Sequence, residues 1–173
     1  MPCCVVKARD VLGLERAAFM AKMAGNDDHA RFDSPAQHML QQIDNAVDSF
    51  RQEMQLEGLW ADVTVVTLSE FGRTISSNGR GTDHAWGGNQ VIYGGAVNGT
   101  RLLGEFPAKL GEHADNPVAL GGGRIMPTNS WESIWAPIAE WMGVGAQDMD
   151  SVLPNRANFL PSSVLSKTDV YKN

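Results

Sequence analysis

The sequence contains little cysteine, no basic run and no long apolar stretch, and each absence excludes a class of protein. Cys3 and Cys4 are the two cysteines. Adjacent cysteines rarely bridge each other, and these have no distant Cys or His at zinc-finger spacing, so both a disulfide framework and a structural zinc motif are excluded. No apolar run approaches the roughly 18 residues of a membrane span. Residues 1–10 lack the apolar core of a signal peptide, so either the protein is cytosolic or its true beginning lies elsewhere.

The balance of charge and hydrophobicity predicts a soluble globular domain. The 173 residues are 43% hydrophobic and 20% charged, and the net charge is -6. This length fits one domain with its own core. A negative chain without interleaved basic and aromatic residues does not suit a nucleic-acid surface, which depends on neutralising phosphates.

The first half of the sequence alternates predicted helices with one predicted strand. Residues 11–24 have the composition of a partly amphipathic helix. Apolar residues then recur at steps of three and four over 35–56, after Asp33 or Ser34 as N-cap and before Gly58 as terminator. The β-branched run at residues 63–68 predicts a buried strand. The order of helix, short loop and strand favours a parallel sheet covered by helices.

The second half predicts a hairpin and one more helix. Residues 90–97 and 100–106 read as strands joined by Asn98-Gly99, a strong hairpin signal. Residues 107–124 form a loop. Ser130 can cap a helix from Trp131 to about Met142, whose face of tryptophan and isoleucine side chains is expected to be core. The last dozen residues are expected to fray.

Polar residues with coordinating chemistry follow the strand at 63–68. Residues 69–74 read Ser-Glu-Phe-Gly-Arg-Thr, and residues 81–90 read Gly-Thr-Asp-His-Ala-Trp-Gly-Gly-Asn-Gln. Ligands of open α/β sheets bind at the carboxyl ends of strands. Glu, Asp and His can ligate a divalent metal. The guanidinium of Arg73 suits an oxyanion such as phosphate, sulfate or carboxylate.

These motifs resemble the bacterial family catalogued as domain of unknown function 1501. The resemblance extends over residues 32–160 and includes Tyr-Gly-Gly-Ala-Val at 93–97, Arg-Ile-Met-Pro-Thr at 124–128, the tryptophan-rich helix, and Val-Leu-Pro-Asn-Arg-Ala-Asn-Phe at 152–159. It implies the alkaline phosphatase and sulfatase superfamily, with a three-layer α/β/α sandwich and metal-assisted hydrolysis of phosphate or sulfate esters. Family members usually exceed twice this length and often begin with a twin-arginine export signal, so the resemblance suggests a periplasmic or extracellular location. The nucleophilic Ser or Thr of that superfamily lies in an N-terminal half that is expected to be lacking here.

Two segments bear on metal binding, because one departs from the family pattern and the other from the pattern of related enzymes. Family members usually carry Phe-Asp-Thr-His, whereas here Asp33 is followed by Ser34-Pro35 and the next histidine is His38. Where related enzymes usually carry an Asp-His pair, this chain has Glu70 and Phe71. A second metal site of the usual kind is therefore expected to be incomplete.

The candidate metal ligands are Asp33, Glu70 and His84, with Asp83 and His38 as secondary candidates, and Arg73 is the candidate oxyanion-binding residue. Each also has a purely structural interpretation. Asp33 could be an N-cap, Glu70 could pair with Arg73, and Asp83 could cap backbone amides. A carboxylate beside His84 could also fix the tautomer of its imidazole. His29 and His113 lie in polar loops and are interpreted as solvated surface residues.

Two functional hypotheses follow. The first is the C-terminal portion of a metal-dependent phosphate- or sulfate-ester hydrolase, inactive by itself, with zinc, manganese or iron as the cation. The second is a non-catalytic relative that binds a metal, an anion or a partner protein. Residues 1–31 would form an N-terminal helical segment, 32–160 the alkaline-phosphatase-like α/β domain and 161–173 a frayed tail. A sheet cut from a larger fold would leave an open edge, through which the chain could self-associate.

Overall fold

The computed structural model describes residues 2–25, 27, 29–30, 33–111 and 115–172, with the side chains of residues 33–35 outside the description. It is a mixed α/β fold with small antiparallel sheets. The α-helices are α1 (Pro2–Lys7), α2 (Arg9–Leu12), α3 (Asp33–Leu56), α4 (Trp131–Trp141), α5 (Met149–Val152) and α6 (Lys167–Val170). The strands are β1 (Thr64–Val66), β2 (Gly72–Arg73), β3 (His84–Ala85) and β4 (Ile92–Gly94), and 3-10 turns lie at η1 (Trp60–Asp62), η2 (Arg156–Asn158) and η3 (Pro161–Ser163).

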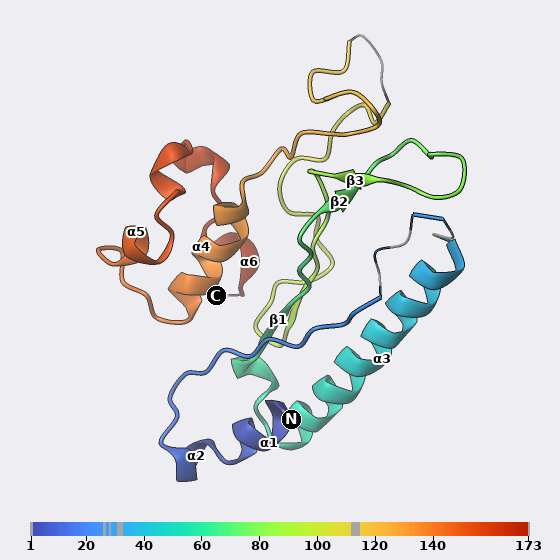
Figure 1. The fold of residues 1–173 in the computed structure, drawn as a ribbon. Helices are drawn as coiled ribbons and strands as arrows, with labels where there is room; N and C mark the ends of the chain where they lie inside the picture. Colours follow the sequence, from blue (N-terminus) through green and yellow to red (C-terminus); the bar gives the residue numbers. More distant parts are fainter. Residues whose placement is uncertain (1, 26, 28, 31–32, 112–114, 173) are drawn as a thin grey trace.

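The elements are arranged along a central path of strands. Figure 1 shows α3 on one side of the strands and α4, α5 and α6 on the other, with β2 and β3 beyond the end of β1. The segment that follows α2 runs back past β1 toward the beginning of α3. Within the described part of the chain, none of the helices is both long and apolar enough to span a membrane.

Helix α3 forms where the apolar periodicity predicts it. It ends at Leu56, and Gly58 follows with φ +70, a left-handed conformation that glycine adopts without strain. Met54 on this helix is fully buried. Lys7 of α1 pairs with Glu53 and, at 3.2 Å, with Glu57, which holds α1 against the last turns of α3.

The helix predicted over residues 11–24 is wrong beyond Leu12. Gly13 has φ +64 and its N–H donates to the carbonyls of Arg9 and Asp10, which closes α2 as a left-handed C-cap. Residues 14–25 contain no regular element. The apolar residues of the predicted helix face are not buried, with Val11 at 90% and Met20 at 89% exposure, so no packing supports a longer helix.

The parallel sheet predicted from the order of elements is not observed among the described strands. β1 pairs with β4 antiparallel, with Val65 opposite Tyr93, and β2 pairs with β3 antiparallel. Between β1 and β4 the chain forms the β2–β3 hairpin and no crossover helix, and a return without a crossover produces antiparallel neighbours.

The hairpin predicted between residues 90–97 and 100–106 is wrong, because the C-terminal segment pairs with residues 96–98 instead. Val97 bridges to Tyr171, the Asn98 N–H donates to the Val170 carbonyl, and the Lys172 N–H donates to the Ala96 carbonyl. Residues 101–106 form no strand, and Thr100 has φ +61. The expected frayed end is also wrong, because Val170 is 0% and Tyr171 2% exposed.

Helix α4 begins and ends close to the predicted residues, but its buried face differs. Ser130 caps it by accepting a hydrogen bond from the Ser133 N–H, and Gly143, with φ +92, follows its C-cap. Its buried residues are Glu132, Ser133, Ala136 and Pro137, whereas Trp131 is 47% exposed. The face of tryptophan and isoleucine side chains is therefore partly exposed, and the prediction that it is core is wrong.

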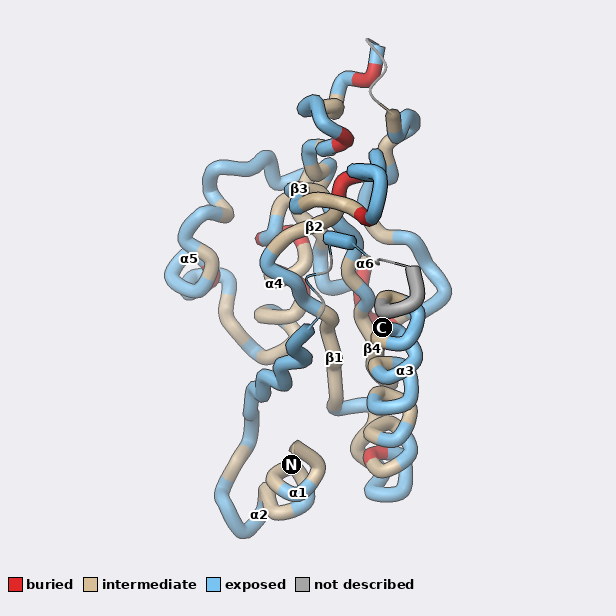
Figure 2. Tube along the Cα trace, turned by 45° about the vertical axis from the view of Figure 1, so that its right-hand side comes forward, coloured by how far each residue is buried: buried red, intermediate tan, exposed pale blue. Residues whose placement is uncertain are grey.

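The chain exposes more surface than a compact domain of its mass. Its accessible area is 11800 Å², compared with about 8,300 Å² for a compact monomer of 18.7 kDa. Figure 2 shows buried residues as short, scattered stretches. The main core cluster is small and joins Val97, Val170 and Tyr171 to Trp141 and other partly buried residues.

Candidate metal centre

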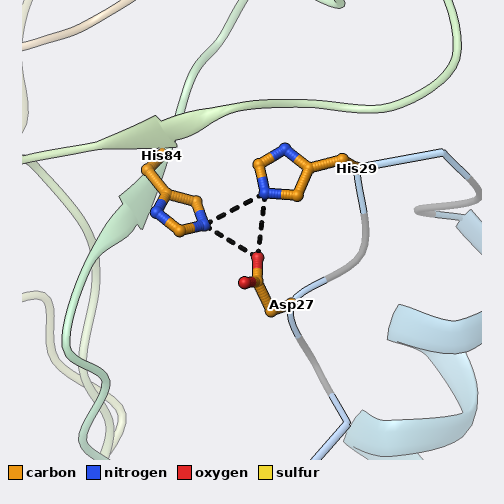
Figure 3. A group of neighbouring side chains, drawn as sticks. All are labelled: Asp27, His29 and His84. Carbon is orange, nitrogen blue, oxygen red and sulfur yellow. Dashed lines mark hydrogen bonds and ion pairs between the residues drawn. The ribbon is translucent and has the colours of Figure 1, made fainter.

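The best-defined polar cluster lies at β3, where two segments of the chain meet. Among the described residues, one group could hold a metal ion: Asp27 and His29 from the segment before α3, and His84 from β3. The Nε2 atom of His84 lies 2.7 Å from Oδ1 of Asp27, and His29 Nε2 lies 3.1 Å from the same oxygen. The two Nε2 atoms are 3.2 Å apart (Figure 3).

These three atoms are spaced as ligands of a small cation would be. Zinc bonds to nitrogen and oxygen are about 2.0–2.1 Å long, so two ligand atoms of a tetrahedral site lie about 3.3 Å apart. Of the separations of 2.7, 3.1 and 3.2 Å, the last two are close to this value, and the first needs to widen by about 0.6 Å. Two imidazoles and one carboxylate are also a common set of protein ligands for a catalytic zinc, with a further position left open.

The short β2–β3 ladder sets the position of His84. Arg73 lies opposite His84 and Gly72 opposite Ala85. A side chain at Gly72 would place its Cβ 1.9 Å from the carbonyl oxygen of Gly87, so only glycine lets β2 lie this close to the backbone that follows β3. The ladder continues into the loop, because the Thr74 N–H donates to the Asp83 carbonyl and the Asp83 N–H to Thr74 Oγ1.

Aromatic packing fixes the plane of the His84 ring. The Phe71 ring stacks on it, with a centroid distance of 3.6 Å and an interplanar angle of 14°. The guanidinium carbon of Arg73 lies 5.2 Å from the Phe71 centroid. Phe71 therefore holds the His84 ring in place by stacking on it.

Arg73 is held inside the cluster by two described contacts. One nitrogen donates to the Thr82 carbonyl at 2.9 Å, and the other lies 3.1 Å from Asp27 Oδ1. Its side chain is only 16% exposed, whereas that of Asp27 is 57% exposed. The expected structural pairing of Arg73 with a carboxylate is thus with Asp27, not with Glu70.

The charges around the site keep its carboxylates ionised. The hydrogen bond from His84 lowers the pKa of Asp27, and the charges of His84, His29 and Arg73 lower it further. Hydrogen bonds from Asn78 and His29 lower the pKa of Asp83. Both side chains are therefore available as anions over the pH range in which imidazole loses its proton.

The structure brings together some of the ligand candidates and not others. His84 is in the cluster, and Asp83 contacts it through His29. Glu70 is exposed and His38 lies exposed on α3, and neither belongs to the group of three. The side chain of Asp33 and the whole of His113 lie outside the described residues.

Sequence reasoning missed Asp27 and the role of His29. His29 is exposed, as expected for a surface residue, but its ring also contacts Asp27, Asp83 and His84, which its position in a polar loop did not indicate. The Asp-x-His spacing at 27–29 was the available signal. It was uninformative alone, because residues that precede α3 meet β3 only through the tertiary fold.

Comparison with protein families identifies the chain. The model of the family described as "Protein of unknown function (DUF1501)" matches residues 11–121, more than half of the 173 residues. The chain belongs to this family. Neither a curated protein nor a solved structure matches it.

The matched region differs from the one expected from the motifs. It begins before residue 32, so it includes Asp27 and His29, and it ends before the tryptophan-rich helix. The region that matches the family model therefore includes all three residues of the cluster and the whole β2–β3 hairpin.

Proposed function

We propose that this member of the DUF1501 family binds a divalent cation through Asp27, His29 and His84 as part of a metal-dependent, hydrolase-like protein. The observation that carries the proposal is the convergence of one carboxylate oxygen and two imidazole nitrogens within 3.2 Å of one another. Zinc, manganese and iron all accept such mixed oxygen and nitrogen ligands. When bound, the cation would act as a Lewis acid toward an ester oxygen.

The proposed substrates are phosphate or sulfate esters, in keeping with the resemblance to the alkaline phosphatase and sulfatase superfamily. Arg73 supports this class, because its guanidinium is held beside Asp27 and carries the positive charge that a developing oxyanion needs. Asp33 and Glu70 remain proposed as further ligands. In this proposal the three-layer sandwich and the nucleophile belong to a larger assembly of which residues 1–173 are the C-terminal portion.

The alternative is a non-catalytic module that keeps the cation or anion site and binds a partner. The large accessible area and the exposed apolar residues of α4 and its surroundings favour a covered surface in the functional state, whether by a further part of the protein or by a second copy. A catalytic assay separates the two hypotheses. The chain by itself is expected to hydrolyse an aryl phosphate negligibly, and robust turnover would contradict this.

Zinc titration of the chelator-treated full chain tests the cation site. The wild type is expected to bind one zinc ion, and His84→Ala and His29→Ala are each expected to weaken binding at least tenfold, because each removes a ligand. His38→Ala is the matched control, since His38 is an exposed histidine outside the cluster. Equal loss in His38→Ala, with no loss in His29→Ala, would instead favour the ligand set Asp33, His38 and His84.

A further inference from the structure

The carboxylate of Asp83 contacts the face of the cluster that points away from the proposed cation. Its Oδ1 lies 3.2 Å from Nδ1 of His29, the ring nitrogen opposite the Nε2 that faces Asp27 and His84. Asp83 precedes His84 in sequence, and sequence reasoning expected it to act on that neighbour. In the structure its carboxylate acts on the histidine from the other segment.

The carboxylate is itself fixed. Asn78 Nδ2 donates to Asp83 Oδ1 at 2.9 Å and to the His29 carbonyl at 3.3 Å. Asn78 Oδ1 accepts from the N–H groups of Arg80 and Gly81, so the side chain that holds Asp83 also organises the loop. The position of Asp83 therefore depends on the hairpin and not on the presence of a cation.

The partners of His29 decide which ring nitrogen carries the proton. A carboxylate beside Nδ1 accepts a hydrogen bond only if Nδ1 is protonated, and a lone pair on Nδ1 would face the negative oxygen. With Nδ1 protonated, Nε2 of neutral His29 has its lone pair directed at the cluster. Histidines that ligate metals commonly donate their second N–H to a carboxylate in this way.

We infer that Asp83 is a positioning residue that holds His29 in the Nδ1–H tautomer, so that His29 Nε2 is free to bind a cation. Asp83 acts through His29 and is not itself a ligand. The cation-binding part of this inference rests on the proposed function, whereas the choice of tautomer does not.

Two measurements on the full chain separate these parts. The first is nitrogen-15 NMR of the metal-free protein near pH 8, which reads the His29 tautomer directly. The second is zinc affinity. Asp83→Ala is expected to lose the preference for the Nδ1–H tautomer and to bind zinc about 10- to 100-fold more weakly. Asp83→Asn is expected to keep part of the tautomer preference and part of the zinc affinity, because the amide oxygen can still accept a hydrogen bond from Nδ1–H.

Asp44→Ala is the matched control, an exposed aspartate on α3 whose loss should change neither measurement. An Nε2–H tautomer in the wild type, or a tautomer that Asp83→Ala leaves unchanged, would overturn the positioning role whatever the zinc affinity. Equal zinc loss in Asp83→Asn and Asp83→Ala with no tautomer change would make Asp83 a direct ligand and also overturn it. A tautomer that responds to Asp83→Ala in a chain that binds no zinc would support the positioning role and refute the proposed function.

Discussion

At the scale of single residues, the three atoms that face one another in the cluster have fewer N–H donors than contacts. If both imidazoles are neutral and His29 Nδ1 donates to Asp83, His84 Nε2 supplies the one imidazole N–H inside the triad. The contact of 3.1 Å between His29 Nε2 and Asp27 Oδ1 then joins two lone pairs. Either a proton on His29 or a cation between the three atoms relieves this repulsion, so the two should compete.

This competition predicts a steep pH dependence of zinc binding. A protonated imidazole has no lone pair for a cation, so in acid the binding of zinc must displace one proton from each of the two histidines. The pKa of Asp27 is lowered from 3.8, so Asp27 is already ionised and releases no proton. Its contribution to folding is likewise present above 3.8 and lost only as the pH falls through the lowered pKa.

In acid, where both imidazoles carry a proton, the apparent zinc affinity should therefore fall by about a factor of 100 for each unit that the pH is lowered, which corresponds to two protons. In His29→Ala the slope should be about a factor of 10. Competition with a chelator of known affinity, at constant ionic strength, measures both slopes. A one-proton slope in the wild type would show that only one histidine binds the ion.

His84 and Arg73 could be selected from the sequence because they follow a predicted strand and stand in a recognisable motif. Asp27 and His29 could not, because they reach the site from a segment without helix or strand periodicity. Their contribution is created by long-range contact between residues more than 50 positions apart. Sequence spacing carries information on local neighbours, whereas two of the three proposed ligands reach His84 from a distant segment.

At the scale of elements, the cluster depends on how closely the segment at His29 approaches the loop after β2. Gly81 is buried, and a Cβ at this position would lie 2.7 Å from the His29 carbonyl oxygen and 3.1 Å from the Ala30 nitrogen. Both atoms are backbone, so they cannot move aside as a flexible side chain would. Glycine at position 81 thus sets the distance between the two segments that share the site.

Gly81→Ala is accordingly expected to weaken zinc binding at least tenfold while all three proposed ligands remain. The substitution should cost about 1–3 kcal/mol of unfolding free energy at most, the usual range for overpacking. Zinc titration and urea unfolding give the two quantities. Gly99→Ala, where a Cβ meets nothing within 4 Å, is the control. Unchanged zinc affinity in Gly81→Ala would show that the His29 segment does not need this contact.

The helices α3 and α4 were predictable because their signals are local. An apolar period and a terminating glycine define α3, and the Ser130 cap and Gly143 define α4. The hairpin at Asn98-Gly99 failed for the opposite reason. The residues of its predicted first strand pair instead with the far end of the chain, where Val97 bridges to Tyr171.

At the scale of the whole molecule, the C-terminal segment closes the structure. Tyr171 stacks on Trp141 of α4 at 5.3 Å, and its hydroxyl lies 3.1 Å from Thr64 Oγ1 of β1. The Leu165 N–H donates to Ser133 Oγ, a second link between this segment and α4. One short stretch thus ties β1, β4 and α4 together, and few other residues in the described part of the chain are buried.

Tyr171 should therefore control global stability. Tyr171→Ala is expected to lower the unfolding free energy by about 3–5 kcal/mol, the usual cost of removing a buried aromatic ring. Tyr171→Phe keeps the ring and should cost only about 0.5–1.5 kcal/mol, for the lost hydroxyl contact. Phe159→Ala, at an aromatic residue that is 40% exposed, is the control. Urea unfolding measures all three, and a small effect of Tyr171→Ala would mean that the C-terminal segment docks weakly.

The same residue predicts how the fold responds to alkali. Burial raises the pKa of the Tyr171 phenol above its ordinary value of 10.0, although the hydrogen bond to Thr64 opposes part of the shift. Between pH 10.0 and the raised pKa, the folded chain holds a proton that the unfolded chain has lost, so stability falls as the pH rises through this window.

Tyr171→Phe cannot ionise at this position, so its unfolding free energy should fall less than that of the wild type over the same window. Unfolding curves at matched pH values give the difference between the two proteins, which isolates the contribution of Tyr171 from everything that the two proteins share. Parallel curves for wild type and Tyr171→Phe above pH 10.0 would mean that the phenol ionises as easily in the folded chain as in the unfolded one.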